Sequence, residues 1–254
     1  MKYGQISKFM SSMGLLLLTA GYVSAELHPY RSEITRSDLQ GERHVLGIAS
    51  PDTIRAVQSG AGITQNVFTS VASYGTGFEP VEGFSPGYIG GQSGWTSFLT
   101  SMIEAHVDVS TPATGVQHLQ VAKDPFLPVG FFVGGFSPYL GPQPSDPTTV
   151  SVEINISALN NGADYYVTPQ APTQGLKTAE VVFEWTGDIK VLDFVGGMWL
   201  YYDTLHDWVP GAYKKLEIDI DPGANTIDYY YDGSLIYTSA GGVWGATSVE
   251  EVVL

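Results

Sequence analysis

Three carboxylates alternate along one short stretch of the sequence: Glu217, Asp219 and Asp221. Residues two apart on a β-strand point to the same face, so these acids would form a row if the stretch is a strand. Two carboxyl groups about 5–5.5 Å apart can act as nucleophile and general acid/base in a retaining glycosidic hydrolysis, and alternate strand positions fit that separation. The alternative is an ordinary solvated strand face, because the intervening Ile218 and Ile220 are apolar.

The same stretch also suggests a cation site. If Ile220 faces Ile227 across a turn, Asp219 faces Asp228 on the next strand. Like charges directly opposite each other destabilise a sheet, and a Ca²⁺ ion would turn that repulsion into oxygen ligation. The alternative is that water screens a weak repulsion between two exposed groups. No sequence motif requires a cofactor, and calcium is the cation that this pattern allows.

Aromatic side chains supply candidate ligand-binding residues. Trp199, Tyr201 and Tyr202 lie within one short run, Trp208 follows it, and Tyr230 alternates with apolar neighbours further on. One face of each strand must be core, so most of these rings are expected to pack internally. The three expected to be exposed are Trp208, Tyr202 and Tyr230.

The element expected to position the carboxylates is a long β-hairpin over residues 213–237. Apolar and charged residues alternate over 214–221, and the alternation resumes over 226–231. Asp-Pro-Gly-Ala-Asn at 221–225 supplies the turn chemistry. Pairing Ile220 with Ile227 places every apolar residue on one side, and such a hairpin needs a second sheet to cover it.

Other short alternating runs predict an antiparallel, all-β fold of two facing sheets, a β-sandwich of the jelly-roll type. Two further hairpins are expected, one turning at Asn160-Asn161-Gly162 and one at Thr186-Gly187-Asp188. A Gly-rich segment ends at Trp95, which is expected to plug one end of the core. The remaining expected strands cover residues 105–110, 116–121, 198–202 and 248–254.

Composition indicates a secreted protein. Residues 1–25 combine Lys2 and Lys8, a short apolar run and a final Val-Ser-Ala, the pattern of a signal peptide. Residues 26–77 are expected to form a polar, partly disordered leader, and residues 78–254 the folded domain. The chain has no cysteine and a formal net charge of −15, which excludes thiol catalysis and disfavours nucleic acid, anionic lipid and acidic polysaccharide as partners. No later segment is apolar enough for membrane insertion after signal cleavage.

Residues 78–254 resemble a known class of domain. The pattern consists of Gly90-Gly91-Gln92-Ser93-Gly94-Trp95, the charged strand at 213–221 and Tyr229-Tyr230-Tyr231-Asp232-Gly233. It is similar to the concanavalin A-like, laminin-G-like jelly-roll domains of secreted bacterial proteins. Within this class, Glu217-Ile218-Asp219-Ile220-Asp221 resembles the E-x-D-x-E signature of family 16 glycoside hydrolases. That resemblance implies Glu217 as nucleophile, Asp219 as assisting acid and Asp221 as acid/base, although Asp has a shorter side chain than the expected Glu.

Three hypotheses follow. The first is a secreted, non-catalytic domain that binds carbohydrate or a cell-surface polysaccharide. The second is a glycoside hydrolase that uses Glu217, Asp219 and Asp221. The third is a structural or adhesion module without a small ligand. Because the jelly-roll scaffold hosts all three, the sites rather than the fold must distinguish them.

Overall fold

The computed structural model describes residues 74–97, 105–122 and 132–254. Within these ranges the regular elements are antiparallel β-strands and one 3₁₀ turn, Pro80–Glu82. The predicted all-β sandwich is therefore confirmed. The expected signal peptide and leader up to residue 73 lie outside the described residues. None of the described ranges contains a helix with the length and apolar character needed to cross a bilayer.

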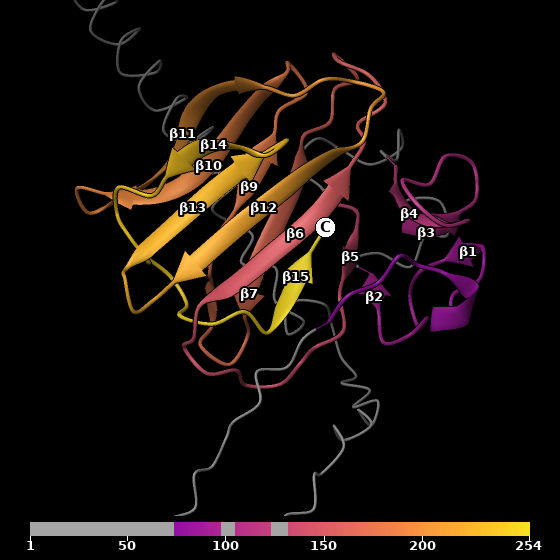
Figure 1. Ribbon diagram of the computed structural model, residues 1–254, viewed down its shortest axis with the longest axis horizontal. Helices are drawn as coiled ribbons and strands as arrows, with labels where there is room; N and C mark the ends of the chain where they lie inside the picture. Colours follow the sequence, from indigo (N-terminus) through magenta and orange to yellow (C-terminus); the bar gives the residue numbers. More distant parts are fainter. Residues whose placement is uncertain (1–73, 98–104, 123–131) are drawn as a thin grey trace, which may run out of the picture.

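Three sheets make up this fold, and Figure 1 shows the four-stranded sheet lying across the face of the eight-stranded one, with the three-stranded sheet beside them. The four-stranded sheet runs in the order β14-β13-β12-β6, with β6 at Thr148–Ile154, β12 at Lys214–Asp221, β13 at Thr226–Tyr231 and β14 at Ser234–Thr238. The small sheet runs in the order β1-β3-β4, with β1 at Gly87–Tyr88, β3 at Ala105–Asp108 and β4 at His118–Val121.

The eight-stranded sheet, here called the large sheet, runs in the order β11-β10-β9-β7-β15-β5-β2, and β8 pairs with β7. Its strands are β2 Thr96–Ser97, β5 Gly135–Phe136, β7 Tyr165–Ala171, β8 Leu176–Lys177, β9 Val181–Phe183, β10 Asp188–Val195, β11 Met198–Asp207 and β15 Glu251–Val253. The predicted hairpin turning at Thr186-Gly187-Asp188 is confirmed as the antiparallel pair β9 and β10.

The β12–β13 hairpin has the predicted register. Ile220 pairs with Ile227 and Ile218 pairs with Tyr229. Asp221 ends β12 and accepts a 2.9 Å hydrogen bond on Oδ1 from the Ala224 backbone N–H, which closes the turn. The apolar residues of both strands therefore lie on one side, facing the large sheet.

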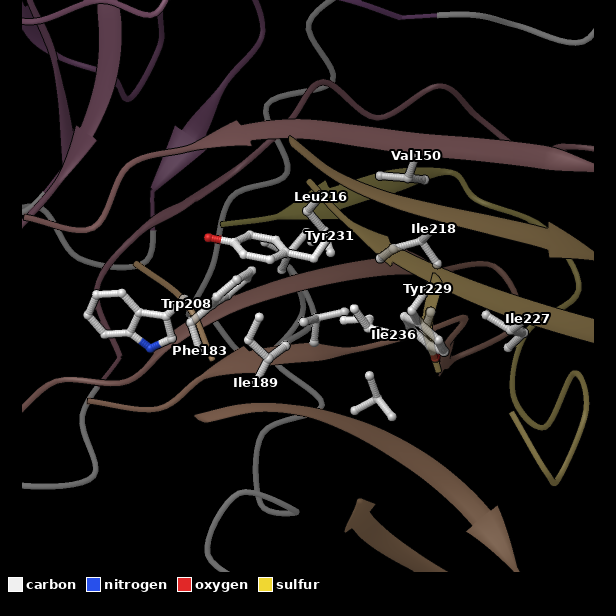
Figure 2. Packing of buried hydrophobic residues seen from close by; sticks show 14 of the residues in the cluster. Val150, Phe183, Ile189, Trp208, Leu216, Ile218, Ile227, Tyr229, Tyr231 and Ile236 are labelled. Carbon is white, nitrogen blue, oxygen red and sulfur yellow. The ribbon is translucent and has the colours of Figure 1, made fainter. Parts of the chain in front are cut away.

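The main core fills the space between the two sheets (Figure 2). Ile218, Ile227 and Tyr229 of the four-stranded sheet are fully buried there, as are Phe183 and Ile189 of the large sheet. These five side chains come from the alternating positions of their strands, so the sandwich follows directly from the period of two.

Ile218→Ala is expected to destabilise the protein by about 2–5 kcal/mol, because it removes buried apolar atoms and leaves a cavity. The free energy of unfolding from a denaturant titration measures this loss. Val81→Ala is the matched control, since Val81 is 92% exposed and should change stability by less than about 0.5 kcal/mol. Equal stability of the two variants would contradict the position of Ile218 in the core.

A buried carboxylate joins the two layers at one end of the sandwich. Asp193 of β10 is fully buried and faces the segment that follows β14. Its carboxylate accepts hydrogen bonds from the Ser239 hydroxyl at 2.7 Å, the Ala240 N–H at 2.8 Å and the Tyr237 hydroxyl at 2.9 Å. Because Tyr237 belongs to the four-stranded sheet and Asp193 to the large one, these bonds fasten the two sheets together.

Two expectations about connections are wrong. The strands flanking Asn160-Asn161-Gly162 do not form a hairpin: β6 pairs with β12, and β7 pairs with strands of the large sheet. The turn instead carries the chain from one sheet to the other, a conformation that an Asn-Gly sequence also allows. Trp95 does not plug the main core either. It is 2% exposed within a separate cluster with Phe84, Ile89 and Val107 beside the small sheet.

Candidate functional site

The predicted catalytic carboxylates lie on the outer face of the four-stranded sheet. Glu217 forms an ion pair with Lys215, and Asp219 accepts a 2.6 Å hydrogen bond from the Thr149 hydroxyl. Asp221 is held by its bond to the turn backbone. Glu217 and Asp219 therefore share a strand face as predicted, whereas Asp221 is part of the turn geometry.

The predicted metal pair lies on the same face. Asp219 and Asp228 are directly opposite each other, as the hairpin register requires. A threonine from each flanking strand donates to one of these carboxylates, Thr149 to Asp219 and Thr238 to Asp228. Among the described residues, no group of three or more His, Asp or Glu side chains could hold a metal ion. Calcium binding here stays a prediction.

The three predicted ligand-binding aromatics have three different environments. Tyr230 lies on the outer face of the four-stranded sheet opposite Glu217 and is half-buried. Tyr202 points inward, where it packs against the main core and stacks on Tyr237 with ring centroids 6.1 Å apart. Trp208 is 2% exposed and lies at one end of the core cluster (Figure 2). The expectation that Trp208 is exposed is therefore wrong, and Tyr202 lies on the core face of its strand, where it is only partly exposed.

The reason is the alternation of β11. Tyr202 pairs with Val191, which is buried in the main core, whereas Tyr201 pairs with Leu192 on the outer side. The strand becomes irregular at Leu205, which has a positive φ of 59° and lies three residues before Trp208. The indole N–H of Trp208 then donates a 2.7 Å hydrogen bond to the Glu184 carbonyl. This bond satisfies the only polar group of the indole and allows the ring to be buried.

The outward residues of β10 and β11 form an aromatic strip that sequence reasoning missed. It consists of Phe194, Trp199 and Tyr201. Phe194 is 37% exposed and pairs with Trp199 across the two strands, with ring centroids 4.6 Å apart. Tyr201 follows two residues later on the same face and is half-buried. The alternating Trp199 and Tyr201 were visible in the sequence, but no signal there showed which face was the outer one.

Tyr201 lies flat across the sheet. Its hydroxyl donates a short hydrogen bond to Oε1 of Glu180, next to the start of β9. The Glu180 carbonyl accepts a 3.1 Å bond from the Leu192 N–H, so β10 separates β11 from Glu180. Neighbouring strands are about 4.8 Å apart, so the tyrosine spans about 10 Å only by lying over Leu192. One face of its ring therefore covers Leu192, and the other faces away from the sheet.

Glu180 fixes the position of the Tyr201 ring. It is 2% exposed, and in addition to the bond from Tyr201 it accepts a 2.9 Å hydrogen bond from Thr168 and forms a 2.5 Å ion pair with Lys177. Burial and the adjacent negative charge of Glu180 raise the pKa of the Tyr201 hydroxyl far above its ordinary value. Tyr201 therefore remains a neutral donor throughout the physiological pH range, with its orientation fixed.

The polar network continues along the same face toward β15. Gln170 of β7 donates a 2.7 Å hydrogen bond to the buried Glu251 and pairs with Lys177 on its other side. Thr168, two residues earlier, points to the same face and reaches Glu180. The outer face of the large sheet thus carries two buried carboxylates and a buried amide that are hydrogen-bonded within the protein. They hold the partly exposed aromatic strip beside them, and that strip suits a ligand with apolar faces.

Comparison with known proteins does not assign a family. No family model matches the chain, and neither does any curated protein. Two solved structures are similar in part. A sialidase has 12% identity and a TM-score of 0.35, over 63% of this chain and 13% of the sialidase chain. Sheep galectin-11 in complex with glycerol has 15% identity and a TM-score of 0.29, over 42% of this chain and 87% of the galectin chain. The chain thus spans a small part of the sialidase's length. These values are too low to support a functional assignment.

Proposed function

We propose that this chain is a secreted, non-catalytic β-sandwich domain of the jelly-roll type that binds carbohydrate. The ligand lies along the strip of Phe194, Trp199 and Tyr201 on the outer face of the large sheet. The observation that carries this proposal is the fixed orientation of Tyr201, whose ring is held across Leu192 by its hydrogen bond to the buried Glu180. A partner such as a cell-surface polysaccharide would present repeated sugar rings to this strip.

The chemistry of the strip suits a pyranose ring. The C–H face of a sugar stacks on an aromatic ring, while its hydroxyls need fixed hydrogen-bond partners at the edges. Trp199 and Tyr201 are two residues apart on β11, so their Cα atoms are separated by about 6.5–7 Å. Because Tyr201 is already oriented, binding costs little further ordering entropy.

Alanine substitution in the strip provides the test. Trp199→Ala and Tyr201→Ala are each expected to weaken binding of an oligosaccharide about 10-fold or more, because each removes a stacking surface. A glycan array identifies the ligand, and calorimetry measures the affinity. Trp185→Ala is the matched control, because Trp185 is 42% exposed outside the strip and should leave the affinity unchanged.

Further arms of the experiment separate the alternatives. If the wild type releases reducing sugar and Glu217→Gln does not, the protein is instead a glycoside hydrolase whose site lies on the four-stranded sheet. Loss of binding in Tyr230→Ala, with Trp199→Ala unaffected, would move the ligand to that same sheet. Loss of binding in EDTA would support the predicted calcium ion. An array without any signal would leave a structural or adhesion module as the function.

A further inference from the structure

The described part of the chain has no uncommitted lysine or arginine. It contains four lysines and no arginine, and each lysine forms an ion pair with a carboxylate. Two of these pairs border the aromatic strip: Lys177 with Glu180 at 2.5 Å and Lys190 with Glu184 at 2.8 Å. A carboxylate or sulfate group on a sugar would therefore find no described cation beside the strip whose charge is not already balanced.

Asp203, in contrast to these lysines, is a charged residue beside the strip that forms no ion pair with a described lysine. It follows Tyr201 by two residues on β11, so it points to the same outer face, and it is exposed. Its Oδ1 accepts a 2.7 Å hydrogen bond from the Leu205 backbone N–H, which fixes the carboxylate and leaves it further acceptor capacity. Lys190 lies directly across from Asp203 and forms its ion pair with Glu184, and although burial opposes it, the charges of both Glu184 and Asp203 help to raise the pKa of Lys190. The strip therefore ends at a fixed carboxylate that Lys190 attracts across the strand pair but that makes no ion-pair contact with a described lysine.

Extending the proposed function, on which this inference rests, we propose that the strip selects amine-bearing saccharides, with glucosamine units carrying free amino groups as the ligand class. The sugar ring stacks over Tyr201, and its ammonium group is bound by the Asp203 carboxylate. An ammonium beside an aromatic ring and a carboxylate gains a charge-assisted hydrogen bond and attraction to the ring face. N-acetylation removes that charge, and a uronic acid reverses it.

Calorimetry with three oligosaccharides of equal length tests this proposal: a β-1,4-linked glucosamine oligomer, its N-acetylated form and an oligoglucuronate. The glucosamine oligomer is expected to bind about 10-fold more tightly than the N-acetylated form, and the oligoglucuronate is expected not to bind. Asp203→Asn should weaken binding of the glucosamine oligomer about 3- to 10-fold and leave the N-acetylated form nearly unchanged.

Two controls make the result specific. Glu153→Gln removes an exposed carboxylate from the four-stranded sheet and should leave all affinities unchanged. Trp199→Ala should weaken binding of the glucosamine oligomer as well. If Asp203→Asn has no effect, if the N-acetylated form binds equally well, or if Glu153→Gln has the same effect as Asp203→Asn, the selectivity for amines is wrong while the proposed function stands. If none of the three oligosaccharides binds, the selectivity for amines is wrong, and the proposed function fails as well only if the glycan array gives no signal either.

Discussion

Between pH 10 and pH 12 the protein is expected to lose most of its conformational stability. Burial, reinforced by nearby carboxylates, raises the pKa of four tyrosines, Tyr166, Tyr201, Tyr229 and Tyr237, above the usual value of 10.0. In the unfolded chain the same side chains ionise near pH 10. The folded protein therefore holds more protons than the unfolded chain above pH 10, so the stability present below pH 10 falls as pH rises.

The expected size of this effect is large. Each tyrosine that stays protonated in the folded state costs about 1.4 kcal/mol of stability for every pH unit above 10. A few such groups over two pH units approach the whole stability of a typical domain, about 5–15 kcal/mol. Denaturant titrations at pH 9, 10, 11 and 12, followed by tryptophan fluorescence, measure the slope.

Tyrosine-to-phenylalanine variants assign the slope to individual groups. Tyr201→Phe should make the decline shallower by about 1.4 kcal/mol per pH unit, whatever it costs at pH 8. Tyr237→Phe should have a smaller effect, because Tyr237 is partly exposed and solvent screens its interactions. An unfolding free energy that is the same at pH 9 and pH 12 would contradict the buried positions of these hydroxyls.

Asp193→Ala is expected to destabilise the protein by about 3–5 kcal/mol. The substitution removes the acceptor for the Ser239 hydroxyl, the Tyr237 hydroxyl and the Ala240 N–H, in a site from which water is excluded. Unsatisfied buried donors cost more than the net value of the bonds themselves. The free energy of unfolding, measured with denaturant at pH 7, gives the size of the loss.

Gly241, in the segment that is hydrogen-bonded to Asp193, allows a second measurement of this contact. A Cβ at Gly241 would lie 2.3 Å from the Phe194 carbonyl oxygen, so Gly241→Ala should force the segment away from Asp193 and destabilise the protein by about 1–3 kcal/mol. Gly75→Ala is its control, because nothing lies within 4 Å of that position. Asp203→Asn is the control for Asp193→Ala, because Asp203 is an exposed carboxylate. If the two variants are equally stable, the hydrogen bonds of Asp193 do not hold the two sheets together.

The β12–β13 hairpin was the part of the fold that could be predicted best. Strict alternation fixes the face of every side chain, and the Asp-Pro-Gly turn fixes the register, so Asp219 was placed opposite Asp228 correctly. Both constraints are local. The pairing of β6 with β12 and the separation of β6 from β7 depend instead on how distant segments pack, which turn chemistry at Asn160-Asn161-Gly162 does not determine.

The candidate site could not be predicted, because β11 carries aromatic side chains on both faces. Trp199 and Tyr201 alternate with Leu200 and Tyr202, so hydrophobicity does not distinguish the core side. The partner strand decides it: Val191 directs Tyr202 inward, and Leu192 directs Tyr201 outward. Composition alone could not distinguish these two arrangements.

The anchoring carboxylates were missed for another reason. Acidic residues are almost never fully buried unless they are paired, and nothing in the sequence marked Glu180, Asp193 and Glu251 as paired. Each has its hydrogen-bond donors on segments distant in the sequence or on a neighbouring strand: Thr168 for Glu180, Ser239 for Asp193 and Gln170 for Glu251. Such partners are known only once the strand order is known.

The position of β15 has a consequence for synthesis on the ribosome. Residues 251–253 insert between β7 and β5 in the large sheet, although β12, β13 and β14 of the other sheet all precede them in the chain. The hairpins of the four-stranded sheet can form as soon as they emerge, whereas β5 and β7 must wait with exposed edges for their shared neighbour. A nascent chain stalled before residue 251 would therefore expose two unpaired edges, and binding by cellular chaperones would be strongest at that stage.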